Sequence, residues 1–401
     1  MREESQPMSN RKLWILRPQT ARAQDDSYES ATPTYSDKLS VGRPERKEPR
    51  MGEYIAFDAH KRYTWVDRED HSTGNRRTFR LEHAPGAVRG YLQGTLPGTA
   101  VAVEATGNWY WIIAEIEQAG CVPRLVHPRK AKLMMGLTNK TDKLDAQGLN
   151  RLQRTGTLPT VWIPPGPLRD VRELTRTRVV FARQRTRLKN RLSATLAKYG
   201  VPASARSDPY GKSGRTETEK NLQCLPEQTR WVSQQLLAQL DFVSQQVREL
   251  EKRLEELVSV TPEMQRLMSL PGVGVILGAT MALEIGEVTR FASAERLASY
   301  AGTTPRVHAS GGKVRFGDLR ADVNRYLKWA FAEAANSIAV NATRVPERHA
   351  SQLYRRLRAK KGHPKAIGAV ARHLAEAAFH VLTRNEPYRD PVLGRGRTSE
   401  V

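Results

Sequence analysis

The chain has 401 residues, and its 65 Lys and Arg against 42 Asp and Glu give a formal net charge of +23. So large a positive charge favours a polyanionic partner such as nucleic acid, and the length favours two or three domains. The two cysteines, Cys121 and Cys224, exclude a disulfide framework or a structural zinc site and fit a reducing bacterial cytoplasm. No apolar run approaches the roughly 20 residues that span a membrane, so no membrane partner is expected.

The two ends of the chain are poor in apolar residues. Residues 1–50 are rich in Ser, Thr, Pro and charge, and they lack the apolar surface that would offset the entropy cost of ordering. We expect a disordered leader over 1–50 and a disordered tail over 389–401. Met51 offers an alternative start, and a chain beginning there is expected to fold normally.

From residue 51 to 165 the pattern is that of an α/β domain. Five apolar strands are expected at 53–60, 62–66, 76–83, 99–106 and 121–128, with a helix at 109–120 closed by glycine. Three early strands followed by alternating helix and strand predict a mixed sheet of the ribonuclease-H-like (RuvC-like) type.

Four carboxylates follow the expected strands and helix. Asp58 ends the first strand, Glu104 ends the fourth, and Asp142 and Asp145 share one face of the helix after the fifth. In a ribonuclease-H-like sheet the first and fourth strands are neighbours, so the acids are expected to converge on one or two Mg²⁺ ions for phosphoryl transfer. Each acid alone is equally typical of a turn or a helix cap.

Residues 166–262 predict two long helices. The first, over 168–199, is rich in arginine, and the second repeats Leu or Val at alternating steps of four and three from Leu236 to Leu257. That period is typical of a coiled coil, either an antiparallel hairpin or a dimerisation arm. Candidate nucleic-acid contacts on the first helix are Arg176, Arg183, Arg187 and Lys189.

Residues 263–388 predict a compact helical domain. The turn "LPGVG" resembles a helix-hairpin-helix turn in which Gly272 and Gly274 meet a phosphate. A glycine-rich loop over 304–317 carries Ser310, which is a candidate nucleophile or simply part of a flexible turn. Further candidate nucleic-acid contacts in this part are Lys313, Arg355, Arg356, Lys360 and Lys361.

Six segments in order resemble one family. They are "YIAFDAHK", "VAVEATGNWYW", "NKTDKLDAQGLNRLQRTG", "LRDVRELTRTRVVFARQRTRLKNRL", "LMSLPGVGVILGATMALEIG" and "LASYAGTTPRVHASGGK". Together they resemble the DEDD insertion-sequence transposases, which are bridge-RNA-guided serine recombinases. The resemblance covers residues 52 to about 388. Two positions depart from the family pattern, Ala56 and Val323, where glycine is usual.

The resemblance implies a fold, a reaction and partners. It implies a RuvC-like domain (51–165), a coiled-coil arm (166–262) and a helical transposase domain with a catalytic serine loop (263–388). Asp58, Glu104, Asp142 and Asp145 take the DEDD places, and Ser310 takes the serine that forms a covalent phosphoserine bond with DNA. The implied partners are donor and target DNA, a structured guide (bridge) RNA, and further copies of the chain as a dimer that assembles to a tetramer.

Two other functions fit the residues. One is a RuvC-type junction nuclease that uses water instead of Ser310, with the same metal-binding acids. The other is a non-catalytic basic protein that binds nucleic acid, in which the four acids are solvated surface.

Overall fold

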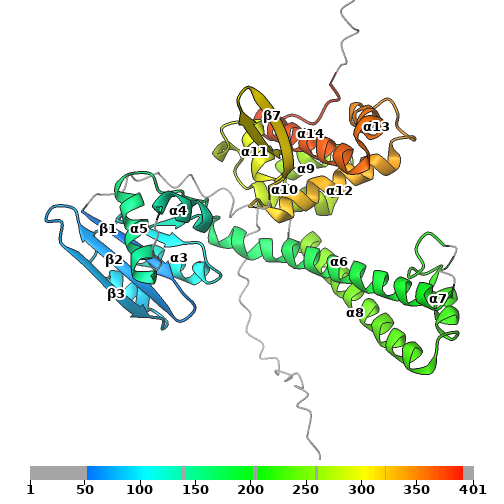
Figure 1. The fold of residues 1–401 in the computed structure, drawn as a ribbon, viewed down its shortest axis with the longest axis horizontal. Helices are drawn as coiled ribbons and strands as arrows, with labels where there is room; N and C mark the ends of the chain where they lie inside the picture. Colours follow the sequence, from blue (N-terminus) through cyan, green and yellow to red (C-terminus); the bar gives the residue numbers. More distant parts are fainter. Residues whose placement is uncertain are drawn as a thin grey trace, which may run out of the picture.

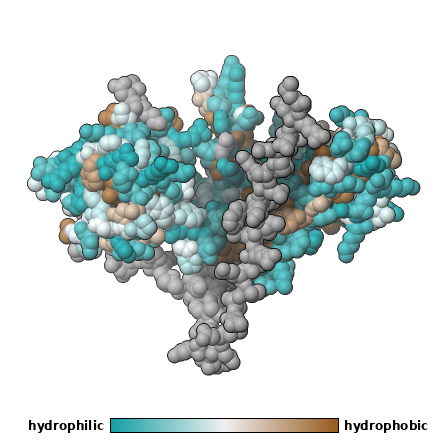
Figure 2. Space-filling view, turned by 90° about the horizontal axis from the view of Figure 1, so that it is seen from below, coloured by the Kyte–Doolittle hydropathy of each residue, from teal (hydrophilic) through white to brown (hydrophobic). Residues whose placement is uncertain are grey.

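The computed structural model describes residues 52–136, 141–201, 204, 206–257, 261–320 and 322–391. The predicted leader, the start at Met51 and residues 392–401 of the predicted tail lie outside them. Figure 1 shows three parts, namely a sheet covered by helices, an arm of two long helices, and a helical part with a β-hairpin. Across the described residues no helix is both long and apolar enough to cross a membrane. The face in Figure 2 is largely hydrophilic.

The predicted mixed sheet is confirmed. Its strands are β1 (Glu53–Ala59), β2 (Tyr63–Asp70), β3 (Arg76–Glu82), β4 (Ala100–Glu104) and β5 (Val122–Val126), in the order β3-β2-β1-β4-β5. The pairs β1–β2 and β2–β3 are antiparallel, whereas β4 is parallel to both β1 and β5. Such an arrangement is compatible with a RuvC-like fold.

Alternating side chains of β1 and β4 enter two different cores, because successive residues of a strand point to opposite faces. On one face Ile55 and Phe57 pack with helices α2 (Ala87–Leu92) and α3 (Trp109–Gln118). On the other, Ala56 and Ala102 pack with α4 (Pro128–Met135) and α5 (Asp142–Arg154). Helices α2 and α4 were not predicted.

The arm consists of α6 (Gly166–Lys198), the short α7 (Arg215–Leu222) and α8 (Glu227–Leu257). The heptad positions Leu240, Val243 and Val247 of α8 are buried, and part of this seam forms one apolar cluster with Leu188 and Leu192 of α6. The seam therefore packs within the chain as a helical hairpin, which is one of the two arrangements that the heptad pattern left open. Supercoiling of the two helices stays a prediction.

Val247→Asp tests this internal seam. The side chain is 1 % exposed, so an unpaired carboxylate there should destabilise the protein by about 3 kcal/mol or more without changing its oligomeric mass. Val232→Asp on the same helix, where the side chain is 45 % exposed, is the matched control and should be near neutral. Denaturant unfolding and light scattering measure both effects. A drop in mass with unchanged stability would place the seam between subunits.

The helical part contains α9 (Pro262–Met268), α10 (Val275–Ile285), the 3₁₀ turn η1 (Val288–Arg290), α11 (Ala294–Tyr300), α12 (Arg325–Asn341), α13 (His349–Lys361) and α14 (His363–Arg384). Their small and apolar residues form the largest core, centred on Leu297, Phe331 and Leu374. Helix α13 carries four of the candidate nucleic-acid residues, Arg355, Arg356, Lys360 and Lys361.

The expected glycine-rich loop is instead a β-hairpin, β6 (Pro305–Ser310) and β7 (Lys313–Leu319). Its two-residue turn, Gly311-Gly312, has φ values of +56° and +75°. Positive φ at both central residues is what a tight hairpin turn requires, and glycine adopts it without a steric penalty. The glycines thus support paired strands, with apolar and polar residues alternating on either side.

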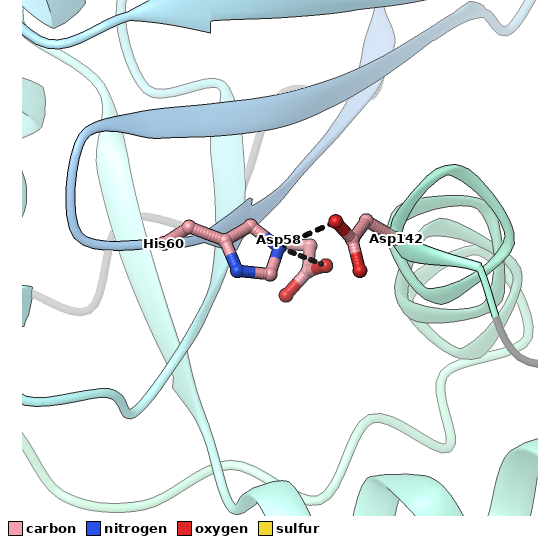
Figure 3. Close-up of side chains that lie close together, drawn as sticks. All are labelled: Asp58, His60 and Asp142. Carbon is pink, nitrogen blue, oxygen red and sulfur yellow. Dashed lines mark hydrogen bonds and ion pairs between the residues drawn. The ribbon is translucent and has the colours of Figure 1, made fainter.

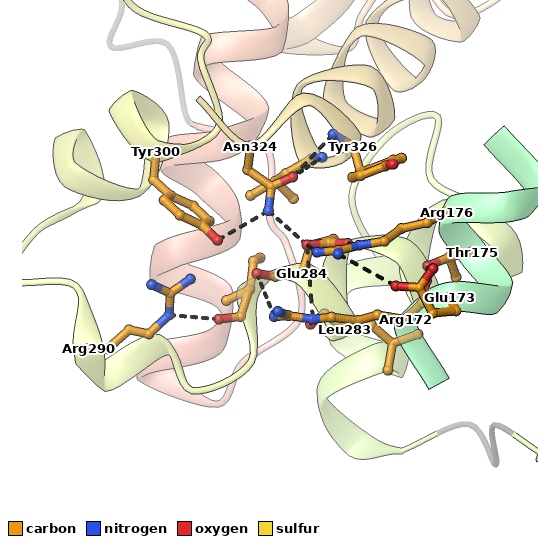
Figure 4. A network of polar contacts seen from close by, with 12 residues as sticks. Arg172, Glu173, Thr175, Arg176, Leu283, Glu284, Arg290, Tyr300, Asn324 and Tyr326 are labelled. Atoms are coloured by element: carbon orange, nitrogen blue, oxygen red, sulfur yellow. Dashed lines mark hydrogen bonds and ion pairs between the residues drawn. The ribbon is translucent and has the colours of Figure 1, made fainter. Parts of the chain in front are cut away.

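A buried carboxylate joins the arm to the helical part (Figure 4). Glu284 of α10 is fully buried, and Arg176 of α6 donates to its two oxygens at 2.7 and 3.0 Å. Asn324 donates to Glu284 at 2.8 Å and caps α12 by accepting from two backbone N–H groups. Burial opposes ionisation of Glu284, but the hydrogen bonds and charge of Arg176 outweigh it and hold the pKa below its usual value.

An aromatic ring ties the sheet part to the same junction. Trp162 lies between the guanidinium groups of Arg172 and Arg290, 4.8 and 4.3 Å from its ring centre. Gly286 has a φ of +60°, and a Cβ there would lie 2.5 Å from the Trp162 ring. The three parts therefore meet in one packed network, which fixes the base of the arm.

Glu284→Ala tests the strength of this junction. Removing the carboxylate leaves the buried guanidinium of Arg172, 3 % exposed, without its acidic partner and removes the two hydrogen bonds that Arg176 donates to Glu284. The loss should cost about 3–5 kcal/mol of folding stability. Glu173→Ala removes a carboxylate at 3.8 Å from Arg176 whose side chain is 56 % exposed, and such surface pairs contribute about 0–1 kcal/mol. Thermal and denaturant unfolding compare the two. An equal loss of folding stability in the two variants would mean that the Glu284 contacts contribute no more than a surface ion pair.

Candidate metal centre and serine hairpin

The sheet register brings two of the predicted acids together. Ile55, Ala56 and Phe57 of β1 pair with residues 101–103 of parallel β4, so Asp58 and Glu104 follow one residue further along neighbouring strands. Both stand on the face that packs against α5, as Ala56 and Ala102 do. Asp58 is 4 % exposed, and Glu104 is partly buried.

Helix α5 supplies the other two acids from its first turn. The Thr141 side chain caps the helix by accepting from the Leu144 N–H, and Asp142 and Asp145 follow. Further along, Asn150 donates to the buried carboxylate of Asp67 at 2.7 Å. Asp67 in turn accepts from Arg76 and Thr78. This network anchors α5 to β2 and β3, and so fixes where its first turn lies.

His60 completes the cluster and was not predicted (Figure 3). Its Nε2 lies 3.1 Å from an oxygen of Asp58 and 3.3 Å from an oxygen of Asp142. Tyr63 donates to the same Asp142 oxygen at 3.3 Å, and Asn108 donates to the His60 carbonyl. One atom from each of Asp58, His60 and Asp142 lies within 4.8 Å of the others. The signal in the sequence was a histidine two residues after a strand-ending aspartate.

The electrostatics of the cluster favour a bound cation. Burial, the hydrogen bond with Asp58, and the charges of Asp58 and Asp145 raise the pKa of Glu104 to about 7. A carboxyl group whose pKa is raised by burial and by neighbouring negative charge lies in a place that is short of positive charge. Hard oxygen ligands with one imidazole beside them suit a divalent metal ion. The residues therefore fit the divalent metal use that a DEDD arrangement implies.

Glu104→Gln tests this charge imbalance. The folded-state pKa is raised, so ionised Glu104 weakens the metal-free fold above pH 7, and this penalty fades as the pH falls toward 4.5. At pH 8 with a chelator, the variant should melt a few degrees higher than the wild type. Added Mg²⁺ should raise the melting temperature of the wild type more than that of the variant. Glu82→Gln, an exposed acid at the end of β3, is the control. A lower melting temperature for Glu104→Gln would contradict the interpretation.

Ser310 lies apart from the acids within one chain. It is the last residue of β6 and is exposed, and the hairpin lies on the helical part, away from the sheet (Figure 1). Ser310 pairs with Lys313, and His308 pairs with Arg315, so these four side chains share one face of the hairpin. The other face carries Val307, Ala309, Val314 and Phe316.

The predicted nucleic-acid residues divide into two groups. Arg176 is engaged by Glu284 in the junction, with its side chain 23 % exposed, and its contact with nucleic acid stays a prediction. Lys189 pairs with Asp208 at 2.9 Å, and Gly272 has a φ of +77° and packs so tightly that a Cβ would lie 2.5 Å from the Ala334 oxygen. The exposed residues are Arg183, Arg187, Gly274, Lys313, Arg355, Arg356, Lys360 and Lys361.

Two family models match consecutive parts of the chain. A DEDD model of IS110 proteins, described as "Transposase", matches residues 56–201. The model of the "Transposase IS116/IS110/IS902 family" matches residues 264–352. The first match contains the four acids, and the second contains Ser310.

Several curated proteins are similar over most of their length. A probable family 20 transposase of Pseudomonas aeruginosa is 24 % identical over 81 % of this chain and 94 % of its own. The transposase for insertion sequence element IS1111A of Coxiella burnetii is 23 % identical over 72 % and 79 %. A pilin gene-inverting protein of Moraxella bovis is 25 % identical over 71 % and 80 %.

Proposed function

We propose that this chain, which carries the DEDD transposase domains of the IS110/IS116 family, moves an insertion sequence by cutting and joining donor and target DNA. The observation that carries the proposal is the convergence of Asp58, Glu104 and the first turn of α5. Relatives named as transposases and as a gene-inverting protein support recombination, since both reactions break and rejoin DNA strands. The net charge of +23 suits a protein that holds several nucleic-acid segments at once.

The metal at this site would be Mg²⁺. Asp58, Glu104, Asp142 and Asp145 would hold it, since carboxylate oxygens are the ligands that Mg²⁺ prefers. When bound, such an ion supplies stabilisation of the charge that develops on the phosphate oxygens. His60 would orient Asp58 and Asp142 through the two contacts of its Nε2.

Ser310 would be the nucleophile. Its Oγ forms a bond to the phosphorus of the scissile phosphodiester, the bond to the 3′ oxygen breaks, and that oxygen leaves with a proton. The DNA then stays joined to the enzyme as a 5′-phosphoserine ester, which keeps the energy of the broken bond for rejoining. Support comes from the hairpin face on which Ser310 stands, because Lys313 and Arg315 there attract a phosphate and His308 is able to accept a proton.

Assembly and guidance follow from the same proposal. Ser310 and the acids lie in different parts of one chain, so a second copy would bring its serine to the acids of the first, in a dimer that assembles to a tetramer. A structured guide RNA would select the DNA through base pairing, and exposed Arg183 and Arg187 on α6 offer contacts to its backbone.

A water-using nuclease of the RuvC type is the second candidate. The observation in its favour is the same separation, because a single chain carries the acids without Ser310 beside them. The two functions differ in whether cut DNA stays attached to protein.

Ser310→Ala distinguishes them. The variant should bind DNA as the wild type does, yet yield no cut strand and no covalent adduct on a denaturing gel, a loss of at least about 10³-fold. Ser72→Ala, an exposed serine in the turn after β2, should leave cleavage unchanged. Asp145→Asn should abolish cleavage by either mechanism. Cleavage by Ser310→Ala without an adduct would favour the nuclease.

A further inference from the structure

A cleft of about 730 Å³ lies at the base of the β6–β7 hairpin. One wall belongs to the helical part, with residues of α11, α14 and the hairpin, and the other includes Arg129 at the start of α4. The cleft is therefore shared by the sheet part and the helical part. Sequence reasoning assigned nothing to its arginines, which are Arg129, Arg296, Arg306, Arg320 and Arg372.

The cleft carries an excess of positive charge. Five arginines line it against two acids, Glu295 and Asp322. Arg320 pairs with Asp322 at 2.8 Å and Arg372 pairs with Glu376 at 2.7 Å, whereas Arg129, Arg296 and Arg306 form no ion pair with any described residue. Guanidinium groups gathered without acidic partners repel one another, and phosphate groups would relieve that repulsion by paired hydrogen bonds.

One aromatic side chain faces this charge. Phe316 of β7 is 71 % exposed and pairs with Val307 across the hairpin, and both line the cleft. With Val307 and Val314, each 57 % exposed, Phe316 forms an exposed apolar patch on the hairpin, and such patches are typical of interaction sites. A planar base could stack between the Phe316 ring and a guanidinium group, which would cover both of its faces. Proteins bind unpaired bases by such stacking.

We propose that this cleft binds an unpaired segment of a DNA strand, with phosphates on Arg129, Arg296 and Arg306 and a base stacked on Phe316. Its volume falls in the range of about 300–1,000 Å³ that accepts a small ligand, which suits one or two nucleotides. The segment would lie on the same hairpin as the candidate nucleophile, because Ser310 is four residues along β6 from Arg306, or about 13 Å at 3.3 Å per residue. Phe316 stands on the opposite face of the hairpin from Ser310. The proposal depends on the proposed function in one respect only, which is that the bound strand is DNA.

The test is photo-crosslinking of single-stranded DNA that contains 5-iodouracil, with the full chain in the presence of a chelator so that no strand is cut. Crosslinked peptides should map to β6–β7, and Phe316→Leu should remove them and weaken single-strand binding about ten-fold in fluorescence anisotropy. Phe242→Leu, which changes another exposed ring, on α8 at 61 %, is the matched control and should change neither result.

A second pair of variants tests the charge. Arg296→Gln should weaken binding of single-stranded DNA and lower its salt dependence, whereas Arg248→Gln, which removes an exposed arginine from α8, should have a smaller effect. Crosslinks outside the hairpin, equal weakening of duplex binding by Phe316→Leu, or tighter binding of RNA of the same sequence would overturn the proposal. Binding is measured without cleavage, so failure of the serine mechanism would leave these results unaffected.

Discussion

The candidate metal centre depends on one constraint, which is that parallel pairing of β1 with β4 holds the carboxylates of Asp58 and Glu104 side by side in a partly buried place. Water cannot fully screen the two charges there, so one acid keeps its proton near neutral pH unless a cation is present. The first turn of α5 adds two more acids, and the Asp67 network keeps that turn in position. Without a cation, the cluster of acids therefore lowers the folding stability of the protein, as is usual for groups that form a functional site.

The second constraint is the Glu284 junction, which connects helix α6 to the part of the chain that carries the serine hairpin. Asn324 accepts from the first turn of α12 and donates to Glu284, and its N–H binds the carbonyl of Tyr300 at the end of α11. The hairpin lies between α11 and α12 in the chain. Both of its ends are therefore fixed to α6 through Arg176.

The sequence allowed the sheet and both long helices to be predicted, because period-two and heptad patterns are local signals, and its strand-ending carboxylates led to the hypothesis of a site with four acids. It did not reveal contacts that depend on a distant partner. The ion pair of Arg176 is one of them, because Glu284 lies 108 residues away. The heptad seam gave the buried face of α8 and left open whether α6 or another subunit covers it. The β6–β7 hairpin was expected to be a loop because of its glycines. The roles of His60 and of the arginine cleft become apparent only in the folded chain, where separate elements meet.

The central claim is that Ser310 and the acid cluster act together although one chain holds them apart. Mixing two inactive variants, Ser310→Ala and Asp145→Asn, tests it most directly on labelled donor and target DNA. The account predicts that the mixture regains strand cleavage, with the covalent adduct found only on the Asp145→Asn chains, which keep the serine. A mixture in which both variants assemble and bind DNA yet no cleavage returns would contradict it.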